Sequence, residues 1–255
     1  MRRLMELIYF AVFCLVLSGS ESEIANEVPE IVAAQEVAAA PTPSPTPEPT
    51  PKPEPEPIAM PQLGSQIVMA GIQWRVLDVY ENYVLVISEY VLEQRRFHST
   101  TAGASWESSD IRSYLNSVFL ENFSEAEISS IVATEVTTDD NLWFGAPGGN
   151  NTFDKVFLLS LEEVVLFFGD SGQFANRHHP RNSVHSVEDR YMPARQTVNL
   201  ETGVDWWWWL RSPGDNRMAT FVGLCGRLGV MGTNPANMNG GVRPAMWIDF
   251  YLFIE

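Results

Sequence analysis

Alternating apolar and polar positions predict β-structure in several parts of the chain. From Ile67 to Tyr80 polar residues interrupt an apolar pattern, and a Glu-Asn pair then leads into the apolar run 83–88. This arrangement is typical of two strands joined by a tight turn. The patterns further along predict a buried strand at 155–160, a glycine-containing hairpin at 218–232 and a final strand at 241–250.

Apolar residues at helical spacing predict two or three short helices among these strands. The first begins after Ser108 or Ser109, either of which is a suitable N-cap, and its apolar residues recur every three or four positions. Ser124 opens a capping box, Ser-Glu-Ala-Glu, ahead of a second helix. A third helix is predicted at 161–168, where Gly169 ends it.

The stretch Asp205–Gly214, which reads DWWWWLRSPG, contains four of the eight tryptophans of the chain side by side. In a strand, Trp206 and Trp208 would lie on one face and Trp207 and Trp209 on the other, because successive side chains point to opposite faces. Each indole has a large apolar surface that is unfavourable in water. The sequence therefore predicts a central strand buried on both sides; the alternative is that one face contacts a ligand.

The first 62 residues differ in composition from the rest. Residues 1–20 combine an Arg-Arg pair, an apolar run and small residues, which predicts a secretory signal or, if it is not cleaved, an N-terminal anchor. Residues 21–62 form an acidic, proline-rich linker, and its segment 41–57 would span roughly 50 Å as polyproline II. A folded domain is predicted at 63–255, displayed outside the cell.

The net charge of −16 argues against a nucleic-acid partner, whose binding requires clustered Lys and Arg. An acidic exported protein has more carboxylates than its basic residues can pair with, and such carboxylates could form a structural calcium site. Apart from Cys14 in the apolar N-terminal run, Cys225 is the one cysteine. We expect Cys225 to be a buried small apolar side chain, because it lies in an apolar hairpin.

Two arginines, Arg211 and Arg243, each follow apolar strand residues and precede a proline. Both are expected to be at least partly buried, and a buried guanidinium requires a carboxylate or several carbonyl groups. We expect structural ion pairs, for which the candidate partners are Asp78, Asp110, Asp154 and Asp205.

Several ordered phrases resemble a family of bacterial exported domains that has no assigned function. They are WRVLD from Trp74, WESSDIRSYLN from Trp106, DKVFLLS from Asp154, WLRSPG from Trp209 and GVRPAMWI from Gly241. The resemblance covers about residues 64–250. That family is in turn similar to the C-type-lectin-like fold of sulfatase-modifying factors and of the variable proteins of diversity-generating retroelements.

The resemblance implies an α+β fold, a single C-type-lectin-like domain with two or three short helices and small antiparallel sheets. It implies that the two ends of the domain lie in neighbouring strands and that ligands bind on loops near the last strands. The loops near the last strands are rich in Asn, whose side chain both donates and accepts hydrogen bonds. We therefore predict ligand contacts from these loops and from one tryptophan, namely Asp215, Asn216, Arg217, Asn234, Asn237, Asn239 and Trp208. Structural roles are predicted for Trp74, Trp106, Trp206, Trp207, Trp209, Arg211 and Arg243.

The sequence favours binding over catalysis. Formylglycine-generating enzymes, the catalytic relatives implied by the resemblance, use active-site cysteine thiols, and this domain has Cys225 alone. No G-x-S-x-G motif is present, and His178, His179 and His185 lie with Glu188 and Asp189 in a polar loop that lacks the spacing of a metal site. We expect no cofactor and an extracellular glycan or protein ligand. The alternatives are a structural or adhesive envelope protein and an enzyme directed at the cell wall.

Overall fold

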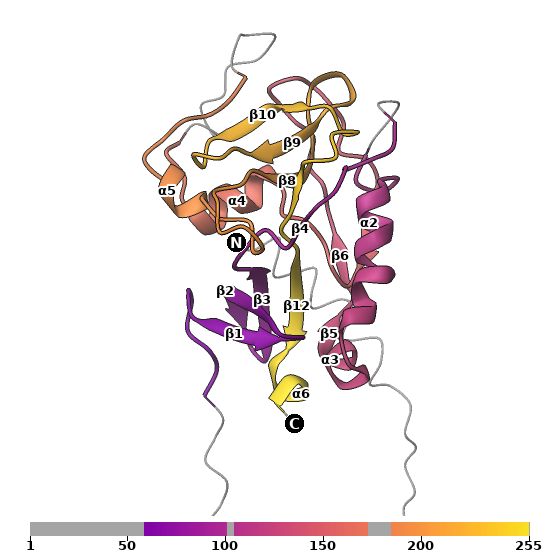
Figure 1. The fold of residues 1–255 in the computed structure, drawn as a ribbon, viewed down its shortest axis with the longest axis vertical. Coiled ribbons are helices and arrows are strands. Elements are labelled where there is room, and N and C mark those ends of the chain that lie inside the picture. The colour runs from indigo at the N-terminus through magenta and orange to yellow at the C-terminus, as the bar shows by residue number, and fades with distance from the viewer. Residues whose placement is uncertain (1–58, 101–104, 173–184, 255) are drawn as a thin grey trace, which may run out of the picture.

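Two five-stranded sheets form the centre of the molecule in the computed structural model, which describes residues 59–100, 105–172 and 185–254. The predicted signal or anchor and nearly all of the linker lie outside these residues. Figure 1 shows the first sheet in the lower half and the second sheet in the upper half, with α2 (Asp110–Leu115) running along one side. Within the described residues, none of the helices has the length and apolar character needed to cross a membrane.

The first sheet has the strand order β1-β2-β3-β12-β5. Its last strand in sequence pairs antiparallel with β3 over five consecutive residues, so both ends of the described chain meet in this sheet. A continuous ladder of this kind leaves few backbone groups unpaired. Its members are β1 (Gln66–Met69), β2 (Ile72–Tyr80), β3 (Tyr83–Ser88), β5 (Ile131–Val132) and β12 (Ala245–Asp249).

The second sheet has the order β10-β9-β8-β11-β4, with the tryptophan strand at its centre. Its ladders are interrupted on both sides of β9 by register shifts. The buried side chain of Asn141 donates hydrogen bonds to Pro213 O (2.7 Å) and Val230 O (2.8 Å) near these interruptions. Its members are β4 (Glu93–Gln94), β8 (Trp208–Pro213), β9 (Ala219–Val222), β10 (Leu228–Thr233) and β11 (Gly241–Val242).

Serine caps begin three of the helices, and the sequence predicted two of them, at Ser109 and Ser124. Ser109 accepts a hydrogen bond from Arg112 N at the start of α2, and Ser124 and Ser160 form complete capping boxes. The described residues contain five α-helices, more than the two or three predicted. Besides α2 they are α3 (Glu125–Ser130), α4 (Leu161–Phe168), α5 (Met192–Arg195) and α6 (Phe250–Ile254); η2 (Val118–Asn122) and η3 (Asp215–Arg217) are 3₁₀ turns, and β6 (Thr134–Val136) pairs with β7 (Thr152–Asp154).

Three strand predictions need correction. The span 67–80 is two strands, because Ala70 and Gly71 both adopt positive φ and form a hairpin turn between β1 and β2. The span 241–250 is divided at Arg243-Pro244 into β11 and β12. Residues 156–160 are buried, but the predicted strand 155–160 forms one isolated bridge, between Phe157 and Ala245, instead of a strand.

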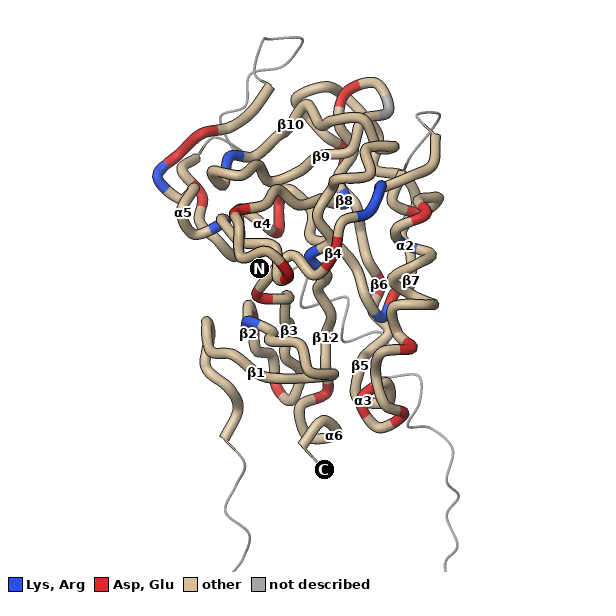
Figure 2. Tube along the Cα trace, in the orientation of Figure 1, with Lys and Arg blue, Asp and Glu red and all other residues tan. Residues whose placement is uncertain are grey.

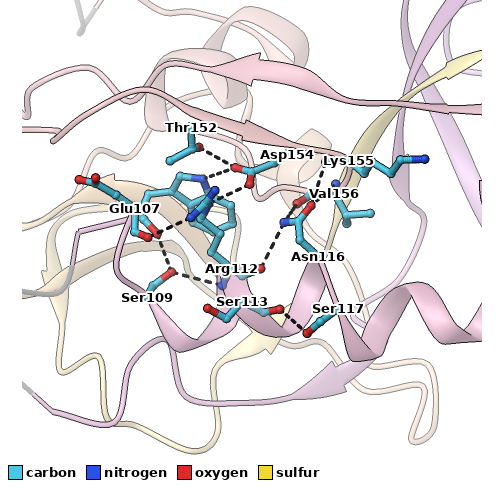
Figure 3. Close-up of polar contacts among 11 residues, drawn as sticks. Glu107, Ser109, Arg112, Ser113, Asn116, Ser117, Thr152, Asp154, Lys155 and Val156 are labelled. Carbon is cyan, nitrogen blue, oxygen red and sulfur yellow. Dashed lines mark hydrogen bonds and ion pairs between the residues drawn. The ribbon is translucent and has the colours of Figure 1, made fainter.

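A buried carboxylate at the end of β7 connects α2 to this strand (Figure 3). Asp154 is 2% exposed and accepts hydrogen bonds from Arg112 Nε (2.8 Å), Trp106 Nε1 (2.9 Å) and Thr152 Oγ1 (2.6 Å). The side chain of Asn116 accepts from Lys155 N at 2.8 Å and donates to Val156 O at 2.8 Å. A buried charge is tolerated only when it is paired and hydrogen-bonded, so this network fixes the position of α2.

Candidate ligand-binding site

An open pocket of about 430 Å³ lies on one face of the second sheet. Proteins bind small molecules and sugar units in pockets of this size. Side chains from the strand ends, the β9–β10 turn and the loop after β10 surround it. Among the residues that the structure describes, eight line it: Trp207, Phe221, Gly223, Leu224, Cys225, Arg227, Thr233 and Asn237.

Glycines in the β9–β10 hairpin determine the shape of the pocket wall. Gly226 has φ of 82°, and a Cβ on it would lie 1.9 Å from Met192 O, so the turn packs closely against α5. Gly229 is opposite Phe221 in the ladder, and a Cβ there would lie 2.4 Å from the Phe221 ring. The missing side chain allows the phenyl ring to lie across β10.

The aromatic wall consists of Trp207 and Phe221. Trp207 precedes β8 and is half-buried, and its ring makes edge contacts with Trp209 (centroids 4.7 Å apart) and with Phe221 (5.5 Å apart). Trp209 is itself fully buried and donates Nε1–H to Arg95 O at 2.8 Å. The exposed part of this wall is therefore held on a rigid buried ring.

Polar groups are contributed by Arg227, Thr233 and Asn237. The Arg227 side chain lies over Gly223, where a Cβ would be 3.0 Å from Arg227 Cγ and 3.2 Å from its Nε. Among the residues that the structure describes, the Arg227 guanidinium has no carboxylate partner. Asn237 Oδ1 accepts a hydrogen bond from Asn239 N at 3.0 Å, which stabilises the loop.

Of the predicted ligand contacts, Asn237 lines the pocket. Asn234 and Asn239 are exposed in the same loop; the side chain of Asn234 accepts from Ala236 N, and Asn239 O accepts from Trp206 Nε1 at 2.9 Å. The predicted residues Asp215, Asn216 and Arg217 form η3 next to β10. Asp215 and Asn216 are not part of the pocket lining, and Asn216 is exposed with φ of 43°.

The predicted ligand contact of Trp208 is wrong, because this side chain is fully buried. Its ring lies on the opposite face of β8 from Trp209, against Phe168 of α4, with its Nε1 donating to Arg195 O at 3.3 Å. The alternation predicted for the tryptophan strand is thus correct for Trp207, Trp208 and Trp209. The error lay in choosing which face is exposed, and Trp207, predicted as structural, is the indole at the pocket.

The other predicted structural tryptophans are buried or hydrogen-bonded. Trp74 and Trp106 are 0% and 1% exposed, and the indole of Trp74 donates to Met69 O at 3.1 Å. Trp206 is half-buried above the loop after β10 through its bond to Asn239. Each indole N–H has a partner, as burial requires.

Arg211 forms the expected ion pair, with a partner that was not predicted. Its guanidinium pairs with Glu163 of α4 and also donates to Leu158 O and Thr137 O, both at 2.8 Å. Asp154, a predicted candidate, is paired with Arg112. Arg211 thereby connects α4 and two loops to the central strand of the second sheet.

Arg243 is fully buried without the predicted ion pair. Its Nε donates to Ser88 O at 3.0 Å, and its guanidinium carbon lies 4.9 Å from the Trp208 ring centroid. Burial lowers the pKa of Arg243 to about 9, so the side chain remains cationic at neutral pH. Carbonyl groups and an indole face replace the carboxylate here.

The polar loop before β8 contains an ion pair that the sequence did not predict. Asp189 pairs with Arg195, whose side chain is completely buried, at 2.9 Å. Burial by itself raises the pKa of Asp189, but hydrogen bonds from Arg195 and from Tyr191 N outweigh it and hold this pKa below its ordinary value. His178 and His179 lie outside the described residues, and His185 contacts Met231 Sδ.

Acidic residues are distributed over both halves of the molecule (Figure 2). In the described parts of the chain, no three His, Cys, Asp or Glu side chains gather in a group that would hold a metal ion. The calcium hypothesis, which rested on composition, therefore has no cluster of acidic ligands in these residues.

Cys225 is exposed, which contradicts the predicted burial. It lies in the β9–β10 turn beside Leu224, which is 52% exposed. The apolar composition of the hairpin predicted a core position, but the turn residues project from the sheet and form the pocket rim.

The chain matches the family described as Domain of unknown function (DUF6273) over residues 81–250. The protein belongs to this family. The match begins at the turn before β3 and includes the second sheet and every lining residue of the pocket. No curated protein and no solved structure matches the chain.

Proposed function

We propose that this DUF6273 protein is an exported, non-catalytic binding module with a C-type-lectin-like topology. In this proposal the N-terminal segment directs export, the proline-rich linker holds the domain away from the cell envelope, and the pocket on the second sheet binds an extracellular glycan or protein ligand. The pocket carries the proposal, because it combines an aromatic wall, a guanidinium and an amide at an open surface.

The topology supports the lectin-like part of the proposal. The last strand, β12, lies beside β3, so the beginning and the end of the domain are neighbours, as that fold implies. The pocket adjoins the loop between β10 and β11, which is close to the last strands.

The lining residues favour binding over catalysis. The eight of them include no His, Asp or Glu that would transfer a proton. Cys225 and Thr233 are nucleophilic side chains, but the lining has no base to activate them.

Binding of the purified full chain to glycan and peptide arrays tests this proposal. The variant Asn237→Ala should reduce binding about tenfold, because Asn237 lines the pocket, whereas Asn239→Ala should retain it, because the side chain of Asn239 lies outside the lining. Wild-type binding that is unaffected by Asn237→Ala and by Trp207→Leu would place the ligand elsewhere. A protein that binds neither class would instead support a structural or adhesive role.

A further inference from the structure

The pocket wall offers a fixed apolar surface to one side of a ligand. Trp207 is held by two edge-on ring contacts, and Phe221 is held across Gly229. Neither ring needs to reorganise to receive a flat, weakly polar face, which lowers the entropic cost of binding. The C–H face of a pyranose ring is such a surface.

Arg227 is the charged residue among the described lining residues, and its guanidinium is free to pair with a ligand. Other arginines of the described chain are engaged, for example Arg112 with Asp154, Arg195 with Asp189 and Arg211 with Glu163. Arg227 has no such partner there, although the chain has twice as many acidic as basic side chains, 32 against 16. None of the described residues that line the pocket is acidic, so none of them competes for Arg227.

A guanidinium of this kind binds a carboxylate through two parallel hydrogen bonds. Thr233 and Asn237 lie in the same lining, and a hydroxyl and an amide both donate and accept hydrogen bonds, as sugar hydroxyls require. The ligand that matches all three features has a carboxylate, an apolar ring face and neighbouring hydroxyl groups.

A peptide carboxylate fits the pocket less well. Peptide termini are commonly bound by free backbone N–H groups, and extended peptides add to a free strand edge. Here Gly223 N already donates to Arg227 O at 2.8 Å, and Asn237 N donates to Asn234 O at 3.0 Å. These two backbone N–H groups are therefore already bonded, and the side chains of Arg227, Thr233 and Asn237 are the polar groups that we assign to the ligand.

Resting on the proposed binding function, we propose that this pocket binds the carboxylated sugar unit, a hexuronic acid, of an acidic glycan. The carboxylate pairs with Arg227, the ring face packs on Trp207 and Phe221, and the hydroxyls bond to Thr233 and Asn237.

Oligogalacturonate and its fully methyl-esterified form are matched probes, because they differ in charge and share the sugar ring. We expect calorimetry with the purified full chain to show at least tenfold weaker binding of the ester. Arg227→Gln should make the two affinities equal. Arg96→Gln removes the same charge outside the lining and should retain the difference. Equal affinities for the wild type, or a difference that survives Arg227→Gln, would overturn the proposal.

Further outcomes separate this inference from the proposed function. If the ester and other neutral oligosaccharides bind equally well and Trp207→Leu abolishes their binding, the pocket binds glycans without selecting acids, and only the inference fails. If peptides with a free C-terminal carboxylate bind better than their amides and glycans do not bind, the acidic-glycan inference fails and a protein ligand replaces it. If none of these probes binds, both fail.

Cys225 provides a local measure of occupancy, because its exposed side chain is part of the lining. We expect oligogalacturonate to slow alkylation of Cys225 severalfold, measured by mass spectrometry of its peptide, and Arg227→Gln to remove this protection. Saturating oligogalacturonate that leaves the alkylation rate unchanged would show that the glycan binds at another place and would overturn the assignment to this pocket.

Discussion

The two sheets of the molecule are built differently. The first sheet brings together the beginning and the end of the domain through an uninterrupted ladder between β3 and β12, and its buried residues are apolar except for Ser88. The second sheet has interrupted ladders, a buried asparagine that bonds to two of its carbonyl groups, and a buried ion pair to α4. The first sheet has one register shift, between β2 and β3, whereas both ladders of β9 in the second sheet are shifted. Interrupted pairing and the glycines of β10 leave room for a pocket in the second sheet.

The sharpest test of this comparison is the ion pair of the second sheet. Arg211→Ala should lower the free energy of unfolding by about 3–5 kcal/mol, because it leaves Glu163 without its cation and removes two bonds to carbonyl groups. Urea denaturation measures this change. Arg227→Ala, at an exposed position of the same sheet, should stay within about 0.5 kcal/mol. Similar losses in both variants would show that the second sheet does not depend on its buried ion pair.

The first sheet should depend on apolar packing. Ile248 is fully buried in β12, between β3 and β5, so Ile248→Ala should cost about 2–5 kcal/mol of unfolding free energy. Val68→Ala in β1 is the control, because Val68 is 60% exposed. A small effect at Ile248 would mean that β12 is not a central element of the fold.

A smaller, pH-dependent effect on the free energy of unfolding is expected where β3 ends, at the ion pair of Arg75 and Glu89. The hydrogen bonds from Arg75 hold the pKa of Glu89 below its ordinary value of 4.5. The folded carboxyl therefore stabilises the protein above that pH, and the contribution is lost as the pH falls through the folded pKa. Since Arg75 is 37% exposed, solvent screening limits the contribution to about 0.5 kcal/mol. Glu89→Gln should reduce the pH dependence of the free energy of unfolding below about pH 4.5. If this pH dependence is unchanged in the variant, it arises from other carboxyl groups.

The smallest effect is expected at the pocket rim. Cys225→Ser should change the free energy of unfolding by less than about 0.5 kcal/mol, because the thiol is exposed and packs in no core. A loss of 1 kcal/mol or more in thermal or urea unfolding would favour the buried position that the hairpin composition predicted.

Local signals in the sequence were sufficient for the caps of α2 and α3 and for the β2–β3 and β9–β10 hairpins, whereas the β1–β2 turn was missed. The serines that begin α2, α3 and α4, the glycine that ends α4, and the β9–β10 hairpin depend on neighbours within a few residues. Burial of Arg211 and Arg243 was also predictable, because apolar residues precede both. The same local rules failed at 155–160, where an apolar run predicted a strand, yet the chain forms one bridge to Ala245.

By itself, the sequence determined that an acidic α+β domain of this family would contain a buried tryptophan strand, because alternation and apolar content are properties of consecutive residues. Only the tertiary structure decided that α4 covers Trp208, that Trp207 faces the pocket, and that Glu163 pairs with Arg211. The contacts of α4 with Trp208 and with Arg211 join segments that are 40 or more residues apart in the chain, such as Glu163 and Arg211 with a separation of 48 residues. A local sequence pattern does not determine which distant carboxylate, ring or loop contacts a given face of a strand, because these contacts depend on the packing of the whole core.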